Sequence, residues 1–154
     1  MEINDHSVAE FHRIALESEP KIGYRLFTVT WLDAAAMQVE RVYSSNALAY
    51  PVGGRKPKRD TAWGRQVLID GEPLICEGDE AIVRMFEDHG TIIGLGLHAS
   101  INAPVLSEGE CVGVLNFLMA SDRVSPQQLR AACDFAMQPA VVGALVAMPR
   151  RRRI

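Results

Sequence analysis

Residues Asn102–Leu118 read NAPVLSEGECVGVLNFL, two apolar runs separated by the polar turn SEGE. Gly109 can supply the positive φ angle that a tight hairpin turn requires. Because strand side chains alternate between the two faces of a sheet, Asn116 lies on the face opposite Leu115 and Phe117. The stretch therefore predicts a β-hairpin with one apolar face and a second face on which each strand places an asparagine.

The full first strand of this hairpin, Leu97–Leu106, and another predicted strand, Tyr24–Leu32, show the same two-faced pattern. In each, one face is bulky and apolar, and the other carries short polar groups without lysine or glutamate. A half-solvated antiparallel sheet also has a polar face, but a freely exposed face usually carries longer charged side chains. Short polar groups among apolar ones favour a covered pocket, where each buried amide needs a partner that a ligand can supply. The polar residues of these strands and of the hairpin are Thr28, Thr30, His98, Ser100, Asn102 and Asn116.

The remaining segments predict helices before, between and after two hairpins. Ser125, Pro126 and Gln128 form a capping signature that opens a long C-terminal helix, and Pro139 predicts a kink near Phe135. Hairpin-connected strands favour antiparallel pairing, so we predict an α+β fold. The other expected elements are a helix Asp5–Ser18 ended by Glu19-Pro20, a strand Met37–Ser44, an irregular loop Tyr50–Asp60, a helix 61–70 closed by Gly71, an extended piece Pro73–Cys76, and a helix Asp79–His89 ended by Gly90.

The bulk composition is that of one globular domain of 154 residues, with 48% hydrophobic and 23% charged residues. The net charge of -3 gives no reason to expect a nucleic-acid partner. Three widely spaced cysteines form neither a disulfide framework nor a zinc site, and we expect no metal and no cofactor. Without a signal peptide or a membrane-spanning stretch, we expect a cytoplasmic protein. We predict one domain over residues 1–149 and a disordered basic tail over 150–154.

Two charged clusters in the middle of the chain are open to more than one interpretation. The basic residues near Gly53 and Gly54 favour a solvated loop, with an anion contact as the alternative. The acidic residues favour a solvated helix start, with a lid for a cationic ligand as the alternative. The basic cluster is Arg55, Lys56, Lys58 and Arg59, and the acidic cluster is Glu77, Asp79, Glu80, Glu87 and Asp88.

Three segments in this order resemble a GAF domain over about Ser7 to Leu145. They read TAWGRQVLIDGEPL, SINAPVLSEGECVGVLNFL and SPQQLRAACDFAMQPAVVGAL. The resemblance implies a central antiparallel sheet of five or six strands. The terminal helices would lie on one face, and the middle helices and loops would cover a small-molecule pocket on the other.

The expected function is that of a sensory or regulatory domain with an unidentified small-molecule ligand. The resemblance further implies a homodimer through the terminal helices Asp5–Ser18 and Ser125–Ala147. Candidate ligand-binding residues are the polar side chains of the second face, with two aromatic residues as pocket walls. They are His98, Ser100, Asn102, Asn116, Thr28, Tyr43 and Trp63.

The residues leave two alternative functions open. Free methionine-(R)-sulfoxide reductases of this family use a thiolate and carboxylates, but the aligned positions fall near Ile93 and on Ser100 and Asn116. A divergent reductase would therefore need Cys76 or Cys111 to reach the pocket. The second alternative is a dimerisation module without a ligand. Because Asn116 replaces a carboxylate with a neutral amide, we predict a neutral polar pocket.

Overall fold

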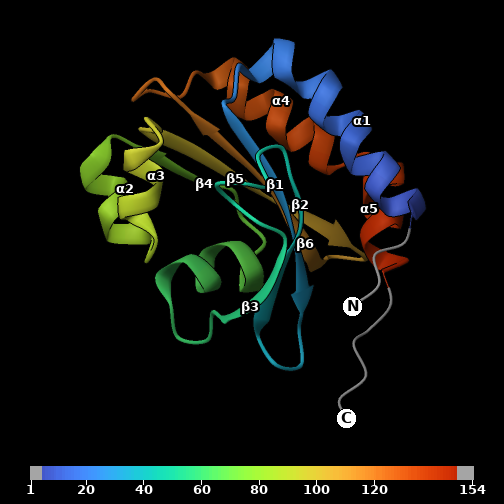
Figure 1. The fold of residues 1–154 in the computed structure, drawn as a ribbon. Coiled ribbons are helices and arrows are strands. Elements are labelled where there is room, and N and C mark those ends of the chain that lie inside the picture. The colour runs from blue at the N-terminus through green and yellow to red at the C-terminus, as the bar shows by residue number, and fades with distance from the viewer. Residues whose placement is uncertain (1–4, 149–154) are drawn as a thin grey trace.

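A six-stranded antiparallel sheet in the order β3-β2-β1-β6-β5-β4 forms the centre of the computed structural model, which describes residues 5–148 (Figure 1). The basic tail predicted at 150–154 lies outside the described residues. The strands are β1 (Leu26–Asp33), β2 (Gln38–Ser44), β3 (Gly53–Pro57), β4 (Leu74–Glu77), β5 (Ala99–Ser107) and β6 (Glu110–Met119).

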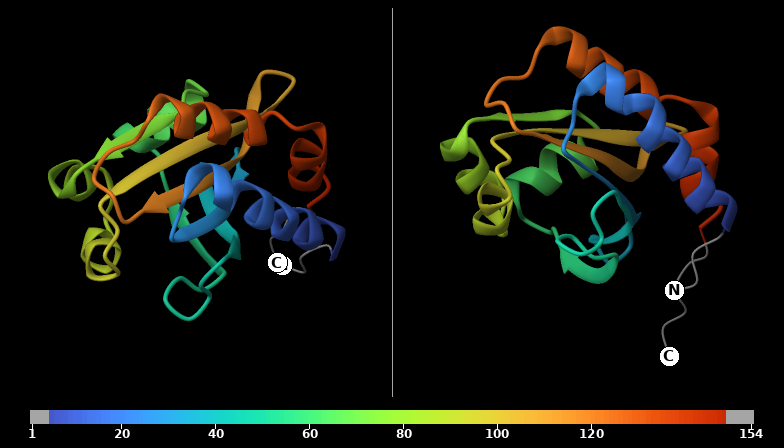
Figure 2. Two further views of the ribbon diagram at one scale, coloured as in Figure 1. Left: turned by 90° about the horizontal axis from the view of Figure 1, so that it is seen from above. Right: turned by 45° about the horizontal axis from the view of Figure 1, so that its top comes forward.

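Helices cover both faces of this sheet. The terminal helices α1 (Asp5–Ile22), α4 (Pro126–Ala136) and α5 (Pro139–Val146) pack on one face. The π-helix η1 (Gly64–Ile69) and the short helices α2 (Asp79–Met85) and α3 (His89–Gly94) lie on the other face, which we call the roof side (Figure 2). This arrangement confirms the predicted α+β fold with a central antiparallel sheet.

The sheet separates two apolar clusters. The first lies beneath the terminal helices and contains Phe11, Phe27, Leu115 and Phe117, all fully buried. The second lies on the roof side and contains Trp63, Val67, Ile82 and Ile92 together with the roof-facing residues of the strands. Alternate residues of each central strand therefore contribute to different clusters, as expected for strand side chains.

The sequence correctly predicted the turn between β5 and β6 and the start of α4. The β5–β6 turn has Glu108 at φ 52° and Gly109 at φ 81°, the left-handed conformations that a two-residue hairpin turn needs. Helix α4 begins with a full capping box, in which the Ser125 side chain and the Gln128 side chain each accept from the other's backbone N–H. The break before Pro139 bends α4 and α5 by 55°.

The predicted ends of two helices were wrong. Helix α1 runs through Pro20 to Ile22, because Ile22 is buried against the terminal-helix cluster and this packing outweighs the bond that proline removes. The segment expected to form one helix up to Gly90 forms α2 and α3 instead. Phe86 adopts an extended conformation (φ −123°, ψ 128°) between them and packs against the roof-side cluster.

The segment predicted as an irregular loop contains strand β3, which pairs with β2 at the sheet edge. Its two glycines have φ angles of 89° and 73°, and Pro57 is at the strand's end, where proline is tolerated. Arg55 anchors the strand by donating to Asp33 (Nη1–Oδ2, 2.7 Å) and Glu40 (Nε–Oε1, 3.3 Å). These partners are distant in sequence, so the pairing has no local signal.

No single helix between residues 5 and 148 combines the length and apolar composition needed to cross a membrane, although the bent pair of α4 and α5 meets both criteria when taken together.

Candidate functional site

A row of three polar residues crosses the roof-side face of the sheet. Thr28 on β1 lies directly opposite Asn116 on β6, and Asn116 lies directly opposite Asn102 on β5. All three are buried, with exposures of 5%, 7% and 2%. Because a buried amide without a partner costs roughly 1–3 kcal/mol, their hydrogen bonds determine what the row can do.

The side chains of this row form one continuous hydrogen-bond chain that starts at Trp63. The indole Nε1–H of Trp63 donates to Asn102 Oδ1 at 3.2 Å, and Asn102 Nδ2 donates to Asn116 Oδ1 at 2.8 Å. Asn116 Nδ2 then donates to Thr28 Oγ1 at 3.1 Å and to Thr30 Oγ1 at 2.9 Å. Because an indole N–H can only donate, Trp63 fixes the orientation of both amides.

Gly64 lets the roof helix η1 bring Trp63 to the sheet. A Cβ atom at position 64 would lie 2.3 Å from the Lys58 carbonyl oxygen and 2.9 Å from Thr61 Oγ1. Only glycine permits this close approach of the two backbone segments. The glycine therefore places Trp63 above Asn102 and brings Lys58 to the same side of the molecule.

A cavity of about 90 Å³ lies between this row and the roof. Its floor is polar and neutral, but three cationic side chains and one carboxylate also line it, which differs from the neutral pocket that the sequence predicted. The lining residues are Thr28, Thr30, Val39, Arg41, Tyr50, Lys56, Lys58, Trp63, Phe86, Asp88, Ile92, Asn102, Asn116 and Leu118.

Two of the cations lie over aromatic rings. Lys58 Nζ is 5.1 Å from the centroid of the Trp63 ring, and Arg41 Cζ is 4.4 Å from the centroid of the Tyr50 ring. Arg41 also donates to the Pro51 carbonyl at 3.0 Å. Burial lowers the pKa of both Lys58 and Arg41, and the neighbouring Lys56 charge lowers that of Lys58 further.

The cavity's carboxylate, Asp88, is engaged by other residues of the wall. It accepts a hydrogen bond from the Tyr50 hydroxyl and lies 4.0 Å from Lys56 Nζ. Burial and this hydrogen bond raise the pKa of Tyr50. These contacts join the β2–β3 side of the cavity to the segment between α2 and α3.

Four of the sequence-predicted site residues meet at this cavity: Thr28, Trp63, Asn102 and Asn116. Ser100 is fully buried one row away, opposite Cys76 and Leu118, and is not among the lining residues. His98 precedes β5, and its Nδ1 lies 2.6 Å from Asp79 Oδ1 at the start of α2. The structure therefore separates His98 and Ser100 from the other candidates.

Tyr43 lies on the opposite side of the sheet from the cavity, although the sequence predicted it as a pocket wall. The register of β2 against β1 slips between Val29 and Thr30, so that Val42 is an extra residue in a β-bulge. The bulge leaves Arg41 on the roof side but turns Tyr43 to the terminal helices. There its ring is 5.8 Å from that of Phe27.

The sequence prediction omitted several lining residues. Thr30 shares its face with Thr28 by simple alternation, and this signal was available in the sequence. Arg41 shares its face with Val39 by the same alternation, so this signal was also available in the sequence. The sequence pointed to Lys58 only as a member of the basic cluster, for which an anion contact was the alternative to a solvated loop. Its place at the cavity depends on the contact between Gly64 and the Lys58 carbonyl, which the sequence does not specify.

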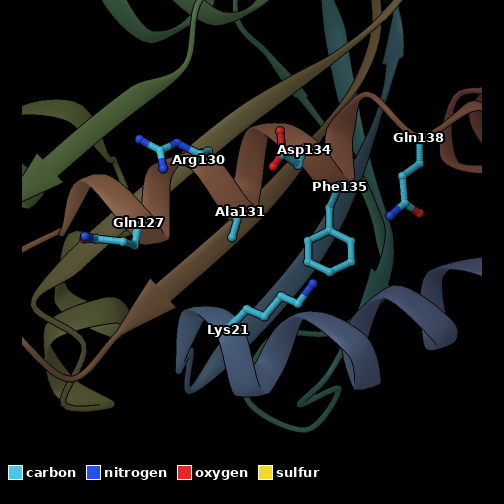
Figure 3. A pocket seen from close by; sticks show the side chains of 7 residues that line it. All are labelled: Lys21, Gln127, Arg130, Ala131, Asp134, Phe135 and Gln138. Carbon is cyan, nitrogen blue, oxygen red and sulfur yellow. The ribbon is translucent and has the colours of Figure 1, made fainter.

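Two other hollows in the described residues are less suited to a ligand. A groove of about 210 Å³ between α1 and α4 is shown in Figure 3, where Lys21 points toward the Phe135 ring, 5.5 Å from its centroid. Its other charged side chains, Arg130 and Asp134, are exposed to solvent. A hollow of about 630 Å³ lies between α5 and the ends of two hairpins. Of these three hollows, the roof-side cavity is the one whose lining carries a chain of buried, hydrogen-bonded polar side chains.

The three cysteines are free thiols, and none of them lines the cavity. Burial raises the pKa of each thiol, that of Cys111 to about 11. A catalytic thiol requires the opposite shift, toward the thiolate. Within residues 5–148, no group of three or more His, Cys, Asp and Glu side chains is arranged to hold a metal ion.

The fold and the cavity define a class of small α+β domains in which one antiparallel sheet carries terminal helices on one face and a roofed cavity on the other. The chain belongs to the GAF domain family, whose model matches residues 9–142. Comparison with curated proteins gave no match.

Several solved structures share this fold at low sequence identity. A GAF domain/HD domain protein from Geobacter sulfurreducens superposes with a TM-score of 0.73 at 13% identity, covering 92% of this chain and 94% of that chain. The GAF domain of a two-component sensor histidine kinase from Bacillus halodurans gives 0.64 at 14% identity, covering 83% and 89%. Free methionine-R-sulfoxide reductase from Neisseria meningitidis, solved with its substrate, gives 0.67 at 16% identity, covering 92% and 78%. At these identities the likeness shows the fold alone.

Proposed function

We propose that this GAF domain is a cytoplasmic sensory or regulatory domain that binds a small molecule in the roof-side cavity. The observation that carries the proposal is the hydrogen-bond chain from Trp63 to Thr28 and Thr30, which is buried and ends at the cavity wall. A sheet face that served only for packing would be more stable with apolar side chains, because burying polar groups costs free energy. The raised thiol pKa values do not favour the alternative of a thiol-dependent reductase.

A matched pair of isoleucine variants tests whether ligands bind in this cavity. Ile92 lines the cavity and is 2% exposed, whereas Ile75 on β4 is 37% exposed and lies outside it. Ile92→Phe fills the cavity, and Ile75→Phe makes the same chemical change elsewhere. Circular dichroism verifies that both variants are folded.

We expect a broad metabolite panel to contain a compound that raises the melting temperature of the wild type, because a ligand that binds only the folded state stabilises it. The shift should disappear in Ile92→Phe and persist in Ile75→Phe. The proposal is wrong if no compound in the panel binds, or if binding is equally strong in Ile92→Phe.

The expected homodimer forms part of this proposal. The terminal helices expose large apolar side chains, Leu16 on α1 (64%), Met137 directly after α4 (75%) and Val146 on α5 (57%). A second copy of the chain would cover these residues and remove their apolar surface from water. Sedimentation velocity should give a dimer at micromolar concentration, and a monomer at 100-fold higher concentration would contradict this part of the proposal.

A further inference from the structure

The hydrogen-bond chain on the cavity floor has a direction. Each donation points away from Trp63, so Thr28 Oγ1 and Thr30 Oγ1 both accept from Asn116 Nδ2. A hydroxyl that accepts still has one proton to donate. Among the described residues neither of these protons has an acceptor in the protein, so the chain ends in two donors at the cavity.

The roof adds further donors. Lys58, Lys56 and Arg41 line the same cavity, and all are donors without an acceptor atom in the side chain. Lys58 makes no ion pair within the described residues and is held over Trp63 at 5.1 Å. Burial of an ammonium group is unfavourable unless an acceptor or an anion compensates it.

The lining holds one carboxylate, Asp88, against three cationic side chains, and Glu87 adds a second negative charge near Lys58. Asp88 already accepts from the Tyr50 hydroxyl and pairs with Lys56 at 4.0 Å. The cavity therefore retains an excess of positive charge and of hydrogen-bond donors. Its volume of about 90 Å³ is far below the ~300–1,000 Å³ of sites for drug-sized ligands, which limits the occupant to a few heavy atoms.

We infer that the cavity selects a small organic anion, with a carboxylate or phosphate group placed between Lys58 and the hydroxyls of Thr28 and Thr30. The inference rests on the proposed function, since it names the chemical class of ligand for the same site. A cationic ligand, which the acidic cluster in the sequence left open, would meet two hydroxyl donors and a lining with more positive than negative side chains.

Calorimetric titration at constant ionic strength tests the inference with compounds of similar size and different charge. Acetate and pyruvate carry a carboxylate, and inorganic phosphate carries the phosphate group. Acetamide is a neutral analogue of acetate, and methylammonium is a cation. Tighter binding of the carboxylates than of phosphate, or the reverse, shows which anionic group the cavity takes.

Three variants locate the binding. Lys58→Met keeps an apolar stem over Trp63 but removes the charge, and should weaken anion binding about 10- to 100-fold. Thr30→Val is nearly isosteric, removes one donor, and should weaken binding about 3- to 10-fold. Lys21→Met, on α1 outside the cavity, is the matched control and should leave binding unchanged.

The outcomes separate this inference from the function on which it rests. Anion binding that weakens in Lys58→Met or Thr30→Val but not in Lys21→Met supports it. Tighter binding of acetamide or methylammonium than of acetate overturns the inference but leaves a ligand-binding domain. Anion binding that neither cavity variant weakens also overturns it. If neither these compounds nor the metabolite panel bind, the proposed function itself is wrong.

Discussion

The two asparagines of the β5–β6 hairpin should be energetically coupled, and a double-mutant cycle can measure the coupling. The variants are Asn102→Ala, Asn116→Ala and the double variant. Asn116→Ala removes three hydrogen bonds to other side chains, those of Asn102, Thr28 and Thr30, together with a longer contact of 3.4 Å to the Thr28 carbonyl that shares the same amide donor. Asn102→Ala removes two, to Trp63 and Asn116.

The expected magnitudes follow from the number of bonds lost. At about 1 kcal/mol per net hydrogen bond, Asn116→Ala should lower the free energy of unfolding by about 3 kcal/mol and Asn102→Ala by about 2 kcal/mol. The bond between the two amides is counted in both single variants, so the double variant should lose about 4 kcal/mol rather than about 5 kcal/mol. For a chain of this size, each 1 kcal/mol corresponds to roughly 2–4 °C in melting temperature.

Urea denaturation of the four proteins gives the coupling directly, provided that the m-values agree. Asn46 lies in the exposed turn after β2, so a cycle that pairs Asn46→Ala with Asn116→Ala is the control and should be additive within about 0.5 kcal/mol. Additivity of the Asn102 and Asn116 variants within the same range would refute the continuous hydrogen-bond chain. The directional argument for an anionic ligand would then lose its basis.

Two further predictions concern packing and ionisation. A Cβ atom at Gly113 would lie 2.6 Å from the Thr30 carbonyl oxygen and 2.8 Å from Leu145, so Gly113→Ala should lower the free energy of unfolding by about 1–3 kcal/mol. Gly143 lies in α5 with open space around it, so Gly143→Ala should raise the free energy of unfolding by up to about 1 kcal/mol. Thermal unfolding measures both effects. Equal effects of the two substitutions would contradict the packing of α5 on β6. Burial raises the pKa of Cys111 from 9.0 to about 11, so the unfolded chain ionises first and stability should fall by about 2 kcal/mol between pH 9 and pH 11. Cys111→Ser lacks this titration, so urea unfolding at both pH values should show a smaller loss, and an identical loss would show that the thiol is not responsible.

The parts of the fold that were predictable from the sequence depend on neighbouring residues. The turn at Glu108 and Gly109 and the capping box of Ser125 are determined within four residues of the chain. The two faces of β5 and β6 follow from alternation alone, which is why Asn102 and Asn116 could be placed together before the structure was known.

The parts that were missed depend on contacts between distant segments. Strand β3 is held by Arg55 through Asp33 and Glu40, and nothing within Gly53–Pro57 itself indicates a strand. The bulge at Val42 reverses the face of Tyr43 because the register of β2 is determined by β1. Lys58 reaches the cavity because Gly64 packs against its carbonyl group, a contact between two segments whose relative position no periodicity specifies.

The division of the core into two clusters gives β6 a mechanical role. Asn116 faces the cavity, and its neighbours Leu115 and Phe117 are fully buried beneath the terminal helices. The three residues share one stretch of backbone, and protein interiors are packed too densely to absorb a displacement locally. A movement of Asn116 toward an occupant of the cavity is therefore expected to displace side chains that pack against α4 and α5. A single strand thus couples the two sides of the sheet, with no hinge or moving loop required.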